Sequence, residues 1–160
     1  MKLNDLIKKV EKKYPLNLAY DWDNVGLLVG DFDSEVKKIL VALEANEKVI
    51  DEAIEKNVDL IVTHHPFIFR KMNKINTKDL KGRLIHKLIK NDISLYSMHT
   101  NFDIAFDGLN DYFMEVMGFE DSKKQRPYIS KSRLFYSIDD RENKKGSCNV
   151  DEFSYPFTFN

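Results

Sequence analysis

The fold is decided by the stretch KKILVALEANEKVIDEAIEKNVDLIVTHHP, residues 37–66. It begins with a continuous apolar run at residues 39–43, which is typical of a strand buried on both faces. Asn46 can then cap a helix, whose apolar residues recur at helical spacing and are Val49, Ile50, Ala53 and Ile54. A second β-branched run, VDLIVT, follows at residues 58–63. Strand, helix and strand in this order predict a βαβ unit with parallel strands and a right-handed crossover.

Segments on both sides of this unit have the periodicity of a helix or of a strand. They are a helix at about 5–13, a strand or tight strand pair at 26–31, a helix at 80–89, a strand at 92–97 and a helix at about 109–117. The last helix is expected to stop at Gly118, because glycine tolerates the left-handed conformation of a helix end. The sequence therefore predicts the α/β class, as a layered βαβ fold with a mostly parallel central sheet.

The composition of the chain changes at about Phe119, where mixed basic and acidic residues replace the apolar periodicity. We expect an α/β domain over residues 1–119 and a polar, poorly defined tail over residues 120–160. The whole chain of 160 residues is the length of one ordinary domain.

Charge and hydropathy exclude two classes of partner. The formal net charge is −1, and no local excess of Lys and Arg is present to bind phosphates, so no nucleic-acid partner is expected. No apolar run approaches the roughly 20 residues needed to cross a bilayer, so no membrane span is expected. The N-terminus has no apolar core of an export signal, which favours the cytoplasm.

Polar side chains follow successive predicted strands. Glu44, the pair His64 and His65, and then His99 and Asp103 come after the runs that end near residues 43, 63 and 97. Ligands of an open parallel sheet gather at the carboxyl ends of its strands, so these residues are expected at one edge. Since Cys148 is the only cysteine, a metal would be held by His, Asp and Glu.

The adjacent histidines favour a site for two metal ions. Neighbouring side chains diverge, so His64 and His65 can each address a different ion, and the carboxylate of Asp103 can bridge them. Ions in such a pair activate water for hydrolysis. Asp103 could instead form an Asx turn or a helix cap, and His99 could hydrogen-bond only a water or the backbone.

Other polar and aromatic residues have weaker indications of function. Glu44 is expected to support a ligand rather than to bind metal, and His86 to be a solvated surface residue of its helix. Tyr20 and Trp22 could line a pocket or pack onto the core, and the second role is the more common one for such residues.

Several motifs together resemble the NIF-three-like dinuclear metal-centre family, often named GTP cyclohydrolase I type 2 homologues. They are DWDNVGLLVGD (21–31), ILVALEANEKVIDEAI (39–54), VDLIVTHHPFIF (58–69) and NDISLYSMHTNFDIAFDGLNDYF (91–113). The resemblance covers about residues 1–119. It implies an α/β subunit in a toroidal hexamer, with two divalent metal ions per subunit, of zinc, iron or manganese. His64, His65 and Asp103 then correspond to metal ligands, and His99 to a catalytic histidine.

The chain also departs from that family. Glu44 stands where the family usually has aspartate, and the family's second histidine and glutamate, in a C-terminal HxxxE-type element, have no counterpart after His99. The chain is therefore expected to be C-terminally short, with residues 120–160 corresponding to the start of a missing segment. The expected function is metal-dependent hydrolysis of a small molecule such as GTP. The alternatives are an oligomeric scaffold, a regulatory metal-binding protein and a truncated, inactive remnant.

Overall fold

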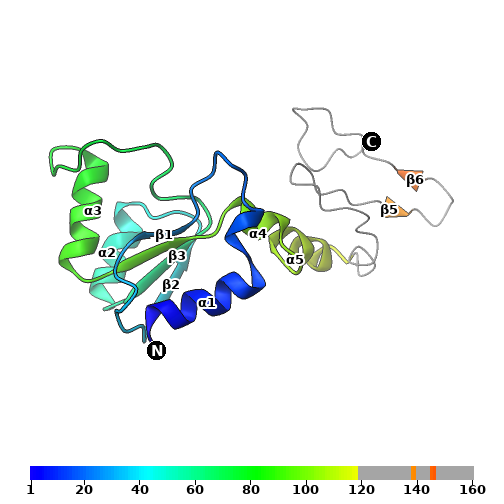
Figure 1. Ribbon diagram of the computed structural model, residues 1–160, viewed down its shortest axis with the longest axis horizontal. Helices are drawn as coiled ribbons and strands as arrows, with labels where there is room; N and C mark the ends of the chain where they lie inside the picture. Colours follow the sequence, from blue (N-terminus) through cyan, green and yellow to red (C-terminus); the bar gives the residue numbers. More distant parts are fainter. Residues whose placement is uncertain (119–137, 140–144, 147–160) are drawn as a thin grey trace. The chain divides into compact units, whose positions relative to one another are not determined.

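The computed structural model describes residues 1–118, 138–139 and 145–146. The chain divides into two compact units, Met1–Phe102 and Asp103–Asn160, and the first contains the layered α/β fold that the sequence predicts (Figure 1). Apart from two short strands, the expected tail at residues 120–160 lies outside the described residues. Within the described part of the chain, no helix is long and apolar enough to cross a membrane.

The sheet of the first unit has the strand order β1-β4-β3-β2. Its strands are β1 (Gly26–Val29), β2 (Ile39–Ala42), β3 (Leu60–Thr63) and β4 (Ser94–Ser97). Strands β2, β3 and β4 are parallel neighbours, whereas β1 pairs antiparallel with β4. Helix α2 (Glu47–Glu55) connects β2 to β3, and α3 (Leu80–Lys90) connects β3 to β4. The predicted mostly parallel sheet is confirmed, and the segment 26–31 contains one strand, Gly26–Val29, rather than a strand pair.

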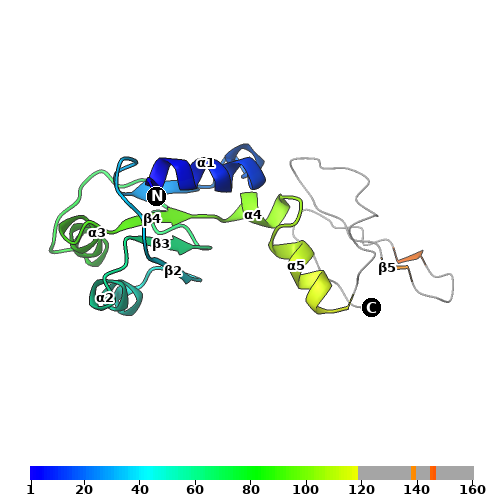
Figure 2. The same ribbon diagram turned by 90° about the horizontal axis from the view of Figure 1, so that it is seen from below.

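Helices cover both faces of this sheet (Figure 2). Helices α2 and α3 pack on one face, where the larger core contains Ile50, Ile61, Ile85, Leu88 and Leu95. Helix α1 (Leu3–Lys13) packs on the other face. The smaller core there consists of the buried residues Leu3, Ile7, Val36, Leu60 and Tyr96. A single turn of 3-10 helix, η1 (Leu16–Leu18), follows α1.

Strand β2 corrects one prediction, because it is not buried on both faces. Val41 is 75% exposed, and Leu43, which follows the strand, is 63% exposed. The strand lies at an edge of the sheet, and the core beneath α1 includes residues of β1, β3 and β4 but none of β2. A continuous apolar run predicts a strand but does not distinguish an edge strand from a central one.

Helix ends show which local signals decide the boundaries. Asn46 caps α2 as predicted, since its side-chain oxygen accepts a hydrogen bond of 3.1 Å from the backbone N–H of Val49. Helix α1 begins at Leu3, two residues before the predicted start at about residue 5, with Lys2 in the capping position and no side-chain hydrogen bond there. The short helix α4 (Thr100–Ile104), directly after His99, was not predicted.

The second unit contains helix α5 (Leu109–Val116) and a two-stranded antiparallel ladder, β5 (Ile138–Asp139) with β6 (Lys145–Gly146). The carboxylate of Asp111 accepts a hydrogen bond of 2.7 Å from the backbone N–H of Asp107, which closes the turn before α5. Gly118 follows α5 with a φ of 84°. Its left-handed conformation confirms the predicted end of the helix.

Candidate functional site

Backbone hydrogen bonds extend the parallel ladders beyond the ends of β3 and β4. The N–H of His65 donates to the carbonyl oxygen of Leu43 over 2.8 Å, so the pairing of β2 with β3 continues through the histidine pair. The N–H of Met98 donates to the carbonyl oxygen of Thr63 over 2.8 Å, which places His99 directly after the β3–β4 pairing. The carboxyl ends of neighbouring strands therefore deliver all these histidines to one edge of the sheet.

The three histidines that the sequence places after the strands lie together. The ring centroids of His64 and His99 are 5.1 Å apart, those of His64 and His65 5.4 Å, and those of His65 and His99 6.0 Å. His64 and His99 are partly buried and His65 is exposed. Imidazole rings at this spacing form a compact group of nitrogen donors at the surface of the first unit.

His99 is oriented by a buried carboxylate. Its Nδ1 lies 3.0 Å from both oxygens of Asp23, whose side chain has no exposed surface. The hydroxyl of Thr100 donates to the same carboxylate over 2.5 Å, and the backbone N–H of Thr100 donates over 3.1 Å. Burial alone would raise the pKa of Asp23, but the hydrogen bonds from Thr100, His99 and Asn24 lower it below its ordinary value. Asp23 is therefore an ionised acceptor.

His64 is oriented by the backbone of the neighbouring strand. Its Nδ1 lies 3.0 Å from the carbonyl oxygen of Met98. A carbonyl oxygen and an ionised carboxylate can only accept, so the proton of each ring, His64 and His99, is on Nδ1 when the ring is neutral. The lone pair of each neutral ring is then on Nε2. Metal-binding histidines are held in this way, with the second ring nitrogen donating to a carboxylate or a carbonyl.

The donor chemistry of this cluster fits a divalent metal as a partial set of ligands. Zinc, iron and manganese accept imidazole nitrogen. Two imidazoles bound to one zinc ion have ring centroids about 5 Å apart, given Zn–N distances of about 2.0–2.1 Å, and His64 and His99 have this spacing. Across residues 1–118, 138–139 and 145–146, no group of three or more His, Cys, Asp or Glu residues has the spacing of a complete metal site.

The other residues selected from the sequence have different positions. Asp103 belongs to the second unit, where its carbonyl oxygen accepts a hydrogen bond of 3.1 Å from the side chain of Asn110. Its role as a metal ligand stays a prediction. Glu44 is exposed at the end of β2, and His86 is exposed on α3 as predicted.

Sequence reasoning missed Asp23. The residue lies in the motif DWDNVGLLVGD, but it is 76 positions from the histidine that it orients, and no local pattern indicates such a contact. Trp22 was expected to pack onto the core as the more common of two roles. That expectation is wrong, because its side chain is 59% exposed.

The loop that carries Asp23 is tied to the histidine-bearing segments at both of its ends. The backbone N–H of Tyr20 donates to the hydroxyl of Thr100 over 3.1 Å. The side chain of Asn24 donates to the carbonyl oxygen of Ile68, in the loop that follows the histidine pair. These contacts hold the loop in place beside the three imidazole rings.

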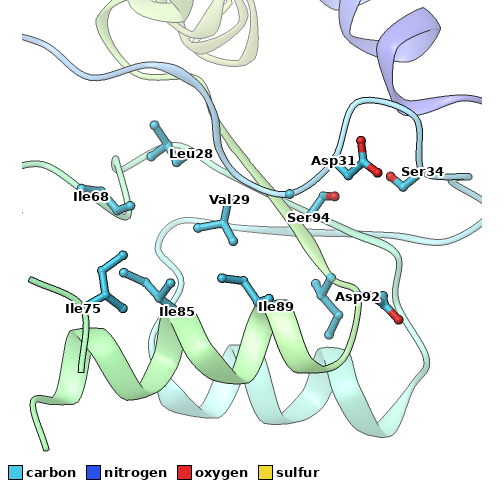
Figure 3. Close-up of a pocket in the computed structure, with 12 residues that line it drawn as sticks. Leu28, Val29, Asp31, Ser34, Ile68, Ile75, Ile85, Ile89, Asp92 and Ser94 are labelled. Carbon is cyan, nitrogen blue, oxygen red and sulfur yellow. The ribbon is translucent and has the colours of Figure 1, made fainter. Parts of the chain in front are cut away.

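A separate cavity of about 560 Å³ opens elsewhere in the first unit. It lies between β1, α3 and the loop that follows β3, and none of the histidines lines it. Figure 3 shows isoleucine and other aliphatic side chains along most of its length, with Asp31, Ser34 and Ser94 gathered near one end. The cavity and the histidine cluster are therefore distinct features.

Comparisons with known proteins give a consistent family relationship. A model of the Duf34/NIF3 (NGG1p interacting factor 3) family matches residues 1–159. A GTP cyclohydrolase 1 type 2 homolog of Clostridium perfringens is 54% identical over 119 residues, which are 74% of this chain and 45% of that protein. The homolog of Streptomyces coelicolor is 35% identical over 157 residues, 98% of this chain and 52% of that protein. The chain thus spans about half the length of these relatives.

Solved structures show the same fold. A Staphylococcus aureus protein has a TM-score of 0.69 and 43% identity, with 74% of this chain and 34% of that chain covered. Reduced HcgD from Methanocaldococcus jannaschii has a TM-score of 0.69 and 39% identity, with 74% of this chain and 47% of that chain covered.

Proposed function

Because the chain belongs to the Duf34/NIF3 (NGG1p interacting factor 3) family, we propose that it binds divalent metal ions at the histidine cluster and hydrolyses a small molecule. His64 and His65 are the proposed ligands of the first unit, and Asp103 keeps its predicted role as a further ligand. The names of the relatives make GTP the first substrate to test. The relatives are about twice as long as the aligned segment, so the activity proposed here is that of the family's complete subunit.

The observation that carries this proposal is that Nδ1 of His64 and Nδ1 of His99 are each hydrogen-bonded to an acceptor of the protein. Each of these nitrogens donates to a fixed protein acceptor, Met98 in one case and Asp23 in the other. A neutral imidazole so arranged offers Nε2 to an electrophile without first changing its tautomer. The two rings are 5.1 Å apart and have the same hydrogen-bonding pattern at Nδ1. Packing of the core alone does not require this arrangement.

Each residue of the cluster has a separate role in the proposed reaction. His64 and His65 would hold the metal ions, which when bound would supply Lewis acidity and activate water. His99 lies at the same edge with its Nδ1 proton held by Asp23, so its Nε2 can accept a proton from a nucleophile or contact a metal. Thr100 donates to Asp23 from its backbone and its hydroxyl and keeps that carboxylate in position.

The donor set is incomplete in the described part of the chain, so the proposal requires further ligands. The family resemblance assigns them to the C-terminal half of longer members, and it also implies a hexamer. On the basis of the implied hexamer, we propose that the chain self-associates, which sedimentation of the purified chain tests. A monomer at all concentrations would contradict this part of the proposal.

Metal content tests the site directly. Elemental analysis is made on protein purified without a chelator, for the parent, for the double variant His64→Ala, His65→Ala, and for His86→Ala. The control removes an exposed histidine from α3, outside the cluster. We expect the parent and the control to hold metal ions specifically and the double variant to hold none. Equal metal content in all three proteins would overturn the proposed ligands.

Catalysis is tested separately, by following the loss of GTP on a chromatography column. In the complete subunit, His65→Ala is expected to abolish turnover, whereas His86→Ala is expected to leave it unchanged. Metal bound specifically but without turnover of GTP or of related amides and phosphoesters would favour the alternative function, a scaffold or regulatory metal-binding protein.

A further inference from the structure

An exposed aromatic cluster lies beside the histidines. Trp22, the only tryptophan of the chain, is 59% exposed, and Phe69 is 53% exposed. Exposed apolar area of this size is unfavourable in water, at about 25 cal/mol per Å². What distinguishes Trp22 from the other exposed apolar residues is its position, because its ring centroid is 6.3 Å from that of His99 in the histidine cluster.

The three aromatic neighbours of Trp22 contact its indole ring in two different geometries. Tyr20 stacks on the indole, with centroids 5.4 Å apart and planes inclined by 13°. Phe69 and His99 stand steeply to the indole, at 6.0 Å and 75° and at 6.3 Å and 72°. Neither of them lies flat against it, so among the described residues Tyr20 alone stacks, and it covers one face. With these three rings in place, Trp22 keeps 59% of its surface exposed.

The position of this indole is set before any ligand arrives. Its loop is anchored by the hydrogen bonds from Tyr20 to Thr100 and from Asn24 to Ile68. The neighbouring Asp23 is bound to His99 and Thr100. A ring held in this way loses little conformational freedom when a ligand stacks on it, so binding is favoured by preorganisation.

We propose that Trp22 binds the planar heteroaromatic ring of the small molecule on which the histidine cluster acts, by stacking of that ring on the exposed surface of the indole. The inference rests on the proposed function and assigns its substrate to the class of nucleobases and related heterocycles. A ring stacked on the indole lies beside His99, whose centroid is 6.3 Å from that of Trp22. Its substituents would then be near the histidine cluster, and Phe69, whose centroid is 6.0 Å from that of Trp22, would flank the same site.

Fluorescence of Trp22 tests the proposal without any turnover. With one tryptophan in the chain, its emission reports on this single position. Guanosine and GTP are the aromatic probes, and ribose 5-phosphate with inorganic triphosphate are the matched probes that lack a ring. We expect quenching that saturates with guanosine and with GTP, and none with the other two. Equal effects of all four compounds would overturn the proposal.

Calorimetric titration of variants with GTP provides the second measurement. Trp22→Ala is expected to raise the dissociation constant about 10- to 100-fold, as for loss of one stacking contact, and Trp22→Phe to raise it much less. Phe32→Ala is the control, because Phe32 is exposed on another loop of the first unit. Identical dissociation constants for Trp22→Ala and the parent would also overturn the stacking role.

Metal content of the same preparations separates the two hypotheses. A parent that holds metal but binds guanosine no more tightly than ribose 5-phosphate contradicts the stacking role and leaves the metal site intact. A parent without metal whose fluorescence is still quenched by guanosine contradicts the proposed function and supports the stacking role.

Discussion

The two ends of the sheet differ in how their buried polar groups are satisfied. At the carboxyl ends of β3 and β4, the Asp23 carboxylate accepts hydrogen bonds from His99, Thr100 and Asn24. At the end where β4 begins, the hydroxyl of Ser34 is buried beside an apolar cavity and has no hydrogen-bond partner among the described residues. Fully paired polar groups hold side chains in one geometry, whereas an unpaired one costs stability. The proposed site therefore lies at the end of the sheet where the buried polar groups are paired.

The largest effect is expected from removing core volume at the cavity end. Ile85 is 2% exposed on α3 and lines the cavity, so Ile85→Ala should lower the free energy of unfolding by about 2–5 kcal/mol. Chemical denaturation measures this loss. The metal content of the folded variant should equal that of the parent, and a loss of metal with intact folding would show that the two ends are coupled.

A smaller effect on stability, but a larger one on the site, is expected from Asp23→Asn. The amide presents donors where His99 and Thr100 also donate, so stability should fall by about 1–3 kcal/mol. Metal affinity, measured by competition with a chromophoric chelator, should fall about 10- to 100-fold. The control is Asp33→Asn, at an exposed carboxylate outside the cluster, and equal affinities for both variants would contradict the orienting role of Asp23.

The pH dependence of stability should report a carboxylate at the amino ends of β2 and β3. Desolvation would raise the pKa of Asp59, but hydrogen bonds from the backbone N–H groups of Lys37 and Lys38 lower it. A lowered pKa contributes stability that is complete above the ordinary Asp value of about 3.9 and is lost as the pH falls through the folded-state value.

Unfolding of the parent and of Asp59→Asn, compared from about pH 7 down to about pH 3, measures this contribution. The parent should be the more stable protein at neutral pH by less than about 1 kcal/mol, since the carboxylate is near the surface. The gap should close as the solution becomes acidic. A gap that is independent of pH would show that the carboxylate charge is not the cause.

The smallest effect is expected from Ser34→Ala. The hydroxyl is buried without a hydrogen-bond partner in the described part of the chain, so its removal takes away no pairing and stability should stay within about 0.5 kcal/mol of the parent or rise slightly. Thermal denaturation checks this. A loss comparable to that of Asp23→Asn would mean that the contrast between the two ends of the sheet is wrong.

Much of the fold could be predicted because its signals are local. The βαβ pattern around residues 37–66, the cap at Asn46 and the helix end at Gly118 each depend on neighbouring residues. The edge position of β2 depends on which strand pairs with which, and α1 does not reach across to cover Val41. The pattern of apolar residues along the chain does not show that β2 is an edge strand with Val41 exposed.

The candidate site also has features that local sequence predicts and features that depend on contacts between distant segments. The grouping of His64, His65 and His99 could be predicted, because all three follow strands and parallel strands end together. The contact between Asp23 and His99 could not, because it forms only when β1 pairs antiparallel with β4. The exposure of Trp22 follows from the same loop, whose position is fixed by hydrogen bonds to distant segments.

That pairing of an early strand with a late one also sets the order in which the protein can mature during its synthesis. β1 leaves the ribosome long before its partner β4. The hydrogen bond of Asp23 can form only after a histidine 76 positions downstream has been translated. His64 and His65 are translated earlier than His99, so a nascent chain exposes them before their neighbour and its carboxylate are in place. The cluster therefore cannot be complete until residue 99 has been translated, and a nascent chain that ends before this residue has the histidine pair but not the oriented third ring.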